Sequence, residues 1–440
     1  MVTELAKTEN GYQSAFRTMR DERPSARWVE LVRESAMDRF QALGFPSVTE
    51  EEWRYTNLAQ LVKSQFEPAV RESEAIDASA FSYPETIGAH IVLVDGFYRE
   101  ELSAAAGLAD VVVIDLFQAI ADGRYGKLVR EYLARNAGYH DNGLAALNTA
   151  FLQSGVLILV PKNVKIDSPI QITCIANGRR AEAANFPRAL VVMEQNSSAT
   201  FVERYASVGQ KQYFTNSVVE VVVKDGACLD HYRLQQESAD AFHVGMTAVE
   251  LGRTSSYTAT SITLGARLSR HDIRVMMDHE GANCHVDGLY VVGSNQHADT
   301  HSVIDHKQPY CSSRQLYKGI LDGNGRAVFN GKIFVRHGAV KTDAIQTNKN
   351  LLLSQSARVD TKPQLEIFAD DVKCAHGAAV GQLDEDELFY LKTRGINPEL
   401  ARNLLTYGFA EEVIEKIAVE SIKAELNEAV LHRLHAKLEG

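Results

Sequence analysis

The stretch SVVEVVVKDGA, from Ser217 to Ala227, contains the pattern that decides the fold. A run of β-branched residues reaches a tight polar corner, and a small residue opens the next run. The same step from one short strand to another recurs, unevenly spaced, along the middle of the chain. The corners of this form are Ser198-Ala199, Gly226-Ala227, Gly281-Ala282, Gly338-Ala339 and Ser356-Ala357.

Short strands that follow one another through small corners, without helices between them, are typical of a coiled parallel sheet. A β-sandwich is the alternative. Recurring inward-pointing Val and Ile pairs favour the coil. We therefore predict a mainly β protein with a parallel β-helix core over residues 151–383.

Both flanks of this core have helical spacing. We expect an N-terminal helical or mixed domain over residues 1–150, where apolar positions from Ser25 to Leu43 recur at helical intervals and Gly44 ends the helix. Thr49 and Glu52 have the spacing of a capping box.

Residues 384–440 are expected to form a C-terminal helical domain. Asp384 has the position of a helix cap, and Asn397-Pro398 has the form of a second helix start. Two further amphipathic helices are predicted over residues 411–426 and 427–438.

The composition excludes several classes of function. The chain has 440 residues and a formal net charge of −11, which argues against nonspecific binding to nucleic acid or to anionic membranes. No apolar run reaches the roughly 20 residues that a membrane-spanning helix needs. The N-terminal residues lack a signal-peptide pattern, and the five cysteines form no C-x-x-C pair. We therefore expect a cytoplasmic protein with free thiols.

A histidine- and aspartate-rich region invites a metal-site interpretation. His297 and His301 have the spacing that converges on a helix, but on a strand they lie about 13 Å apart. We therefore expect polar stacks along one face of the coil rather than a metal site. The histidines of this region are His271, His279, His285, His297, His301 and His306.

Two other segments have features of catalytic or ligand-binding motifs. The carboxylates of Asp370 and Asp371 could serve glycoside hydrolysis, but adjacent residues on a strand point to opposite faces. The glycine-rich segment LDGNGRAVFNG, from Leu321 to Gly331, lacks the phosphate-loop pattern and is expected to be a turn.

Cys374 and His376 stand at the end of the β region, in the segment QLEIFADDVKCAHGAAVGQ. Residues i and i+2 of a strand point to the same face, so both side chains can converge on one metal ion or one partner surface. A thiolate and a neutral imidazole are good ligands for iron or zinc. Two ligands do not complete a site, so others would have to come from across a subunit interface. The structural alternative is a buried Cys374 and a hydrogen-bonded turn residue at His376.

Several motifs resemble one family. VKTDAIQTNKNLLLS (Val340 to Ser354), ADDVKCAHGAAVGQLDEDELFYLKTRGI (Ala369 to Ile396) and ARNLLTYGFAEEVIEKI (Ala401 to Ile417) resemble the SufB/SufD family of iron–sulfur cluster assembly proteins. EEEWRYTNL (Glu50 to Leu58) resembles a motif of the SufD branch. The SufB branch has a cysteine in the stretch that corresponds to residues 346–348 and a glutamate in place of Gly377. The chain is thus more similar to the SufD branch.

The resemblance implies a right-handed parallel β-helix with helical domains at both ends. It implies a non-catalytic scaffold subunit in a complex of one SufB, one SufD and two chains of the ATPase SufC. His376 would lie at the SufB–SufD interface as a ligand or helper for a nascent cluster shared with SufB, and Cys374 is the weaker candidate. SufC would dock on the C-terminal helices, around Gly408, Phe409, Glu411 and Glu412.

Other implications of the resemblance concern cofactors and partners. No cluster is expected to be bound stably by this chain alone, reduced flavin is expected on the whole complex with no residue assigned, and two copies can pair when alone. The alternatives are a SufB-like scaffold that binds the cluster itself and, from another class, a β-helix carbohydrate-active enzyme.

Overall fold

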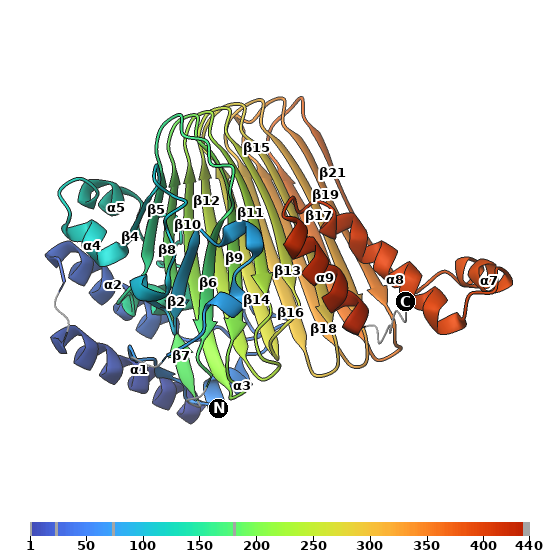
Figure 1. Cartoon of the computed structure of the whole chain (residues 1–440), viewed down its shortest axis with the longest axis horizontal. Coiled ribbons are helices and arrows are strands. Elements are labelled where there is room, and N and C mark those ends of the chain that lie inside the picture. The colour runs from blue at the N-terminus through green and yellow to red at the C-terminus, as the bar shows by residue number, and fades with distance from the viewer. Residues whose placement is uncertain (1, 23–24, 73–74, 179–181, 434–440) are drawn as a thin grey trace.

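Two β-sheets stack face to face, and the chain passes from one to the other at each turn of a coil (Figure 1). The computed structural model describes residues 2–22, 25–72, 75–178 and 182–433. The named strands pair in parallel, apart from the antiparallel pairs β4–β5 and β2–β3. The mainly β fold, a parallel solenoid with helices at both ends, is therefore confirmed.

Strands alternate between the two sheets along most of the chain. The first sheet contains, in spatial order, β4 (Val112–Asp115), β5 (Val156–Val160), β8 (Arg188–Met193), β10 (Tyr213–Val223), β12 (Phe242–Leu251), β14 (Leu268–Met277), β16 (His297–His306), β18 (Arg326–Val335) and β20 (Arg358–Ile367). β7 (Ala183–Asn185) also pairs with β10, and β1 (Glu67–Pro68) pairs with β7. The second contains β3 (Phe97–Tyr98), β2 (His90–Val94), β6 (Ile170–Ala176), β9 (Ser198–Ser207), β11 (Cys228–Gln235), β13 (Ser256–Thr263), β15 (Asn283–Val292), β17 (Ser312–Leu321), β19 (Asp343–Leu352) and β21 (Lys373–Gly381).

Alternate residues of each strand fill the bore between the sheets. Val219, Val221 and Val223 of β10 point inward and belong to the buried core. Register fixes the columns: Cys228 pairs with Ser256, and Ser256 pairs with Asn283. One coil therefore takes about 30 residues, and inward side chains stack on one another from coil to coil.

The small residues at the corners are buried where the chain crosses between sheets. Ala227, Ala282 and Ala339 have no exposed surface, and Cys311 is 1% exposed at another corner. A larger side chain there would collide with the corners of neighbouring coils, because the interior is close-packed. The small-corner pattern thus has the packing role that the sequence predicts.

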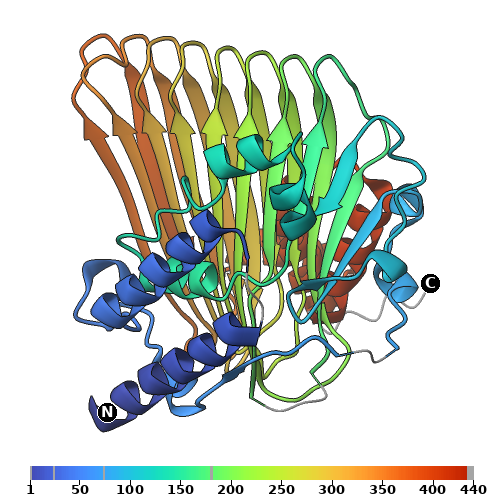
Figure 2. The same ribbon diagram turned by 90° about the vertical axis from the view of Figure 1, so that its left-hand side faces the viewer.

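The N-terminal helices cover the first coils on the outer face of the first sheet (Figure 2). The ring of Tyr12 lies 5.9 Å from that of Phe40 and 5.8 Å from that of Phe151, in the core between helices and sheet. Gly44, at φ 66°, ends the second helix as expected. These helices are α1 (Val2–Glu22), α2 (Arg27–Leu43), α3 (Ala59–Lys63), α4 (Leu116–Ala121), α5 (Gly126–Tyr132) and α6 (Gly143–Ala150).

A fully buried ion pair joins these helices to the sheet. The guanidinium of Arg188 on β8 pairs with Glu220 on β10 and also donates to Asn148 of α6, at 3.0 Å. The carboxylate of Glu220 accepts from the backbone N–H of Ala134 at 2.9 Å. Both charges therefore have compensating partners, as a buried ion pair requires.

The C-terminal helices are α7 (Glu385–Thr393), α8 (Pro398–Ile414) and α9 (Glu420–Arg433). Asp384 and Asn397 cap α7 and α8 through their side chains, as predicted. Residues of α8 and α9 pack on the outer face of the second sheet, whereas α7 projects from the body (Figure 1). Within the described ranges, no helix has both the length and the apolarity to cross a bilayer.

The predicted division of the last helices is wrong. The break falls at residues 415–419 rather than after residue 426, and residues 434–438 lie outside the described chain. Ile417 and Val419 are buried in the cluster that joins these helices to the second sheet. Their anchoring interrupts a segment whose local spacing favours one continuous helix.

The ring of Tyr317 occupies space inside the bore that Gly288 leaves free. A Cβ added at Gly288 would lie 2.2 Å from a ring carbon of Tyr317, which is buried. We expect Gly288→Ala to lower the free energy of unfolding by about 1–3 kcal/mol, because the rigid ring cannot move aside. Gly408→Ala is the control: apart from its own helix, no atom lies within 4 Å of the added Cβ, and alanine inside a helix should leave the stability equal or higher. Urea denaturation of both variants measures the difference, and equal stabilities would contradict this packing.

Candidate functional site

The end of the solenoid farthest from the N-terminal helices is open. β20 and β21 are the last strands of the two sheets, and each pairs with a strand on one side only. Ile367 and Val380 lie at inward-facing positions of these strands but are 43% and 48% exposed. Among the described residues, no further coil covers them.

Cys374 and His376 both lie on β21 at this open end. Cys374 packs against the core and is half-buried, so its side chain faces the bore, and His376, two residues on, is at the same face. His376 is exposed because the bore ends there. Burial raises the pKa of the Cys374 thiol, which therefore stays protonated near neutral pH in the isolated chain.

The residues one coil below are buried and polar. In the register, Ala344 pairs with Cys374 and Gln346 pairs with His376. Gln346 and Asn348 of β19 are fully buried. The position of His376 is therefore part of the bore in earlier coils and becomes surface only at the last one.

The open end offers an incomplete ligand set. Across the described residues there is no group of three or more His, Cys, Asp and Glu side chains placed to hold a metal ion. Cys374 and His376 supply two donor atoms at most. A metal-containing species bound there would need ligands from another molecule.

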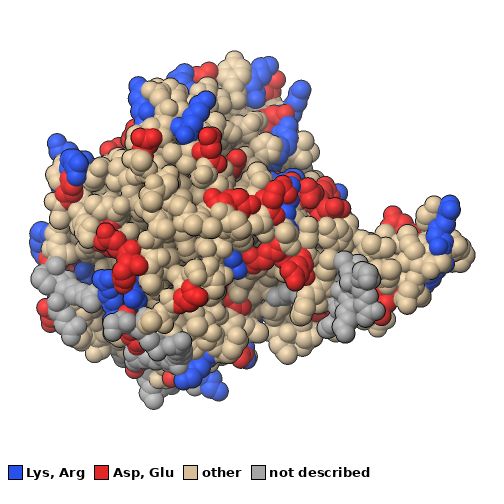
Figure 3. All heavy atoms as spheres, in the orientation of Figure 1, with Lys and Arg blue, Asp and Glu red and all other residues tan. Residues whose placement is uncertain are grey.

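The residues assigned to SufC docking by resemblance lie on α8, and they divide into two pairs. Phe409 and Glu412 contact the solenoid through Lys318 of β17: the ammonium donates to the Phe409 carbonyl at 2.8 Å, lies 4.3 Å from its ring and pairs with the Glu412 carboxylate. Gly408 and Glu411 are exposed. Figure 3 shows acidic side chains gathered over the C-terminal helices. Exposed acidic residues of this part of the chain are Glu411, Glu412, Glu415 and Glu420.

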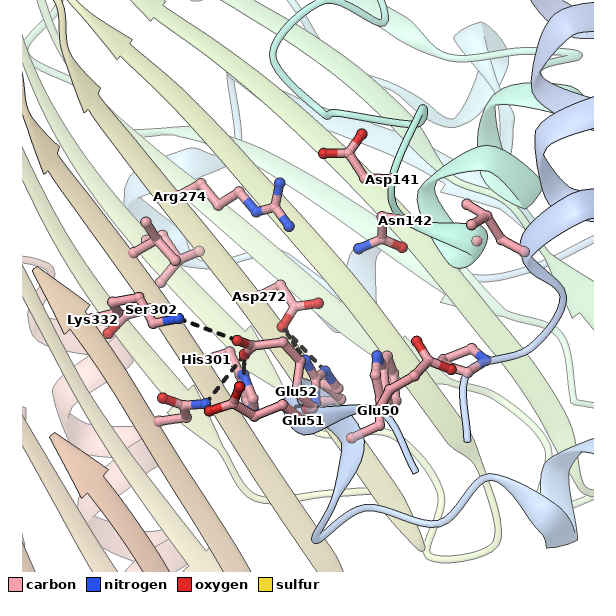
Figure 4. Close-up of a pocket in the computed structure, with 18 of the residues that line it drawn as sticks. Glu50, Glu51, Glu52, Asp141, Asn142, Asp272, Arg274, His301, Ser302 and Lys332 are labelled. Atoms are coloured by element: carbon pink, nitrogen blue, oxygen red, sulfur yellow. Dashed lines mark hydrogen bonds and ion pairs between the residues drawn. The ribbon is translucent and has the colours of Figure 1, made fainter. Parts of the chain in front are cut away.

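A second constellation joins two motifs far apart in the sequence. The segment that contains Glu52, Trp53 and Thr56 lies on the outer face of the first sheet, against the histidine- and aspartate-rich strands β14 and β16 (Figure 4). We call residues 50–56 the clasp. Its meeting with these strands was not foreseen, because neither motif alone indicates its partner.

Arg270 is the centre of the surface that receives the clasp. Its guanidinium lies 2.9 Å from Asp272 and 2.8 Å from Asp299, and it stacks 3.8 Å from the centre of the Trp53 ring. It also donates to the backbone carbonyl of Glu52 at 2.8 Å. Thr56 donates to Asp299 at 2.5 Å. The charges are thus paired and largely closed off from water.

The carboxylate of Glu52 serves the clasp rather than a helix cap. It lies 3.1 Å from Nδ1 of His301 and 3.3 Å from Nζ of Lys332. The predicted capping box of Thr49 and Glu52 is therefore wrong. The hydroxyl of Thr49 bonds Ser47 in the preceding turn, and the charged surface of the sheet attracts Glu52 more strongly than a backbone N–H does.

His297 and His301 lie on the outer face of β16, against the clasp. The ring of His297 bonds the hydroxyl of Thr56 at 2.8 Å, and His301 bonds Asp299 and Glu52. His271 and His306 instead face the bore, where they bond Thr247 and Ser313. The histidines of this region therefore do not share the single polar face predicted from the sequence. Asp370 and Asp371, the considered carboxylate pair, lie in the turn before β21, where Asp371 pairs with Lys341.

A cavity of about 550 Å³ lies beside the clasp, between the sheet and the start of α6. Figure 4 shows Arg274 and Asp141 on either side of it, with Asp272 and His301 at its base. Most of its lining charges already have partners, as described above. The cavity therefore separates the N-terminal helices from the sheet on one side of the clasp.

The electrostatics of the clasp depend on two coupled groups. Burial opposes protonation of His301, but the carboxylates of Asp299 and Glu52 outweigh it and raise the pKa of His301 above 6.5. The hydrogen bond from His301 lowers the pKa of Glu52 from 4.5 to about 2, against the effect of burial. A protonated His301 and an ionised Glu52 therefore stabilise each other.

The pH dependence of clasp docking follows from these shifts. Protonated His301 stabilises the docked clasp in full below pH 6.5, and this stabilisation is lost as pH rises through the raised pKa of His301. Ionised Glu52 stabilises the docked clasp in full above pH 4.5, and this stabilisation is lost as pH falls toward the lowered pKa of Glu52, about 2. We expect tightest docking between pH 4.5 and 6.5. Acrylamide quenching of Trp53 fluorescence, in a Trp28→Phe background, measures it.

In wild type, Trp53 should become more accessible to acrylamide as pH rises above 6.5. In Glu52→Gln this pH-dependent change should largely disappear, because His301 loses one of its two anionic partners. Glu50→Gln is the control, since its carboxylate bonds the backbone N–H of Ser47 in its own turn. A pH profile that is unchanged in the Glu52 variant would show that the clasp is held without this ion pair.

Comparison with known proteins agrees with the motifs. Residues 6–172 match the family described as SufBD protein N-terminal region, and residues 174–409 match that described as SUF system FeS cluster assembly, SufBD core domain. The chain is 35% identical to an iron–sulfur cluster assembly SufBD family protein of Synechocystis, over 90% of this chain and 89% of that protein. It is 33% identical to the iron–sulfur cluster assembly protein SufD of Escherichia coli over 90% of both chains, and 27% identical to SufD of Bacillus subtilis over 94% of this chain and 96% of the other. The chain therefore belongs to the SufBD family of the SUF iron–sulfur cluster assembly system.

Proposed function

We propose that this protein is a non-catalytic scaffold subunit for iron–sulfur cluster assembly in the cytoplasm, which pairs through its open end with a SufB-type protein. The observation that carries the proposal is the uncovered last coil, with His376 exposed at its mouth. The likeness to SufD proteins over nearly the whole chain supports it.

The strand edges at the open end favour a β-helical partner. The outer edges of β20 and β21 carry backbone N–H and C=O groups that no described strand pairs with. Exposed apolar side chains lie beside these groups, including Ile345, Ile367, Phe368 and Val380. A second coiled sheet can pair with the edges and cover the side chains at once. A second copy of this chain would fit the same surface when the SufB-type partner is missing.

The cluster is cargo at this seam rather than a resident cofactor. His376 would contribute an imidazole nitrogen, and the SufB-type partner would contribute the remaining ligands. Cys374 is less available, because its thiol is half-buried and protonated. The alternative of a SufB-like chain that holds a cluster alone would need ligands that the described residues do not bring together. Nothing in the described chain specifically favours a carbohydrate-active enzyme.

The C-terminal helices are the proposed dock for a SufC-type ATPase. Gly408 and Glu411 face solvent on α8, while Lys318 holds Phe409 and Glu412 against β17. If the ATPase displaced α8, the movement would reach β17 through Lys318. β17 lies in the same sheet as β21, with only β19 between them. Binding of reduced flavin to the whole complex stays a prediction with no residue assigned.

Removal of the exposed imidazole should separate cluster formation from assembly. We expect His376→Ala to abolish cluster formation in the complex with the SufB-type and SufC-type partners. The complex itself should persist, because the side chain of His376 is exposed in the described chain. Iron and sulfide content and the visible absorption of the purified complex measure the outcome. Cys374→Ala is the matched neighbour and should have the smaller effect. If the His376 variant formed clusters as the wild type does, His376 would have no part in cluster formation.

A charge placed at the open end should prevent pairing. We expect Val380→Lys to weaken association with the SufB-type partner at least tenfold, because the partner would bury an unpaired ammonium. Ile87→Lys adds the same charge at another exposed apolar position, far from β21 in the sequence, and should leave association unchanged. Analytical ultracentrifugation of mixed chains compares them. Equal affinities would show that pairing uses another surface.

A further inference from the structure

One buried oxygen on the residue in register with His376 lacks a hydrogen-bond donor. Gln346 is 0% exposed, and its Nε2 donates to Oε1 of Gln315 at 2.6 Å. Its own Oε1 is buried and has no partner. A buried carbonyl oxygen without a donor is unfavourable, and such atoms in native proteins usually have a specific reason.

The neighbouring polar side chains of the same strand are satisfied. Oδ1 of Asn348 accepts from Asn350 at 2.7 Å and from Thr361 at 2.8 Å. Oδ1 of Asn350 accepts from the hydroxyl of Tyr290. Gln346 therefore differs from both asparagines of β19 in keeping an unused acceptor.

The amide of Gln346 is held in place from across the bore. A Cβ added at Gly331 of β18 would lie 2.0 Å from its Nε2, so the amide occupies the space that this glycine leaves. The bond to Gln315 fixes the same end from the coil below. The side chain thus cannot turn away to find another donor without losing both contacts.

We propose that Gln346 is the positioning residue for His376: its free Oε1 accepts a ring N–H of His376 once a partner covers the open end. The two residues are in register on adjacent strands, about 4.8 Å apart, with both side chains toward the bore. This bond selects one imidazole tautomer and turns the lone pair of the other nitrogen toward the seam. Histidine ligands commonly have such a second hydrogen bond. The inference rests on the proposed function of His376.

The tautomer of His376 is the direct readout. The full chain, labelled with ¹⁵N-histidine and purified with its unlabelled SufB-type partner, gives the ring ¹⁵N shifts, and His376→Ala assigns the signal. In the wild type we expect one tautomer to dominate. Gln346→Leu should change the tautomer ratio roughly fivefold, the effect that one neutral hydrogen bond supplies. Gln346→Glu keeps an acceptor oxygen. The amide of Gln315 would have to turn over, so that its Nε2 donates to the second carboxylate oxygen, and the wild-type tautomer ratio should then return.

Gln315→Leu is the graded comparison: it keeps the Gln346 acceptor but removes the bond that fixes the Gln346 amide, so the tautomer ratio should change less than in Gln346→Leu. Equal tautomer changes in the two Leu variants, or none in either, would overturn the inference. Thermal unfolding of both variants identifies any general loss of stability. Failure of the proposed function has a different signature: the partner would not co-purify, or the ring of His376 would stay open to modification by diethylpyrocarbonate in the complex.

Discussion

Register between successive coils is the constraint on which the rest of this structure depends. Each strand pairs in parallel with the strands of the coils before and after it, so every inward side chain lies on the residue at the same position of the next coil. A shift of one residue would turn a whole inward face outward. Strands β17 to β20 all have ten residues, and differences in coil length fall in the corners, such as the long turn between Val335 and Asp343.

The same constraint explains why the two ends of the solenoid differ. At the first coils, the N-terminal helices and the buried pair of Arg188 and Glu220 close the sheet against solvent. At the last coil, strands β20 and β21 continue the register, but no strand of the described residues pairs with their outer edges. His376 occupies a column whose previous member, Gln346, is fully buried. An interior position has thus become a surface, and a stacking partner restores the environment that earlier coils already have.

The sequence predicts the coil, its corners and the helix caps because these depend on residues close together in the chain. Ala227 at a corner, Gly44 after α2 and Asp384 before α7 are examples. Contacts between segments far apart in the chain could not be predicted from the sequence alone. Glu52 has the spacing of a capping residue, yet it binds His301, 249 residues away. Coils also differ in length, so the pairing of Gln346 with His376 could not be counted from the sequence.

Polar pairs inside the bore give the register its specificity. His231 of β11 bonds Glu203 of β9 at 2.9 Å, and both are nearly inaccessible to solvent. Such a pair adds little net stability, but a shifted register would leave one charge buried alone, which is strongly unfavourable. The column that contains His231 continues through Gln315 and Gln346 to His376. Ala259 and Val286 separate His231 from the three polar members at the end of the column, which align the last coils. His376, the last member of this column, lies at the open end, where a second protein can place its own coil in register with it.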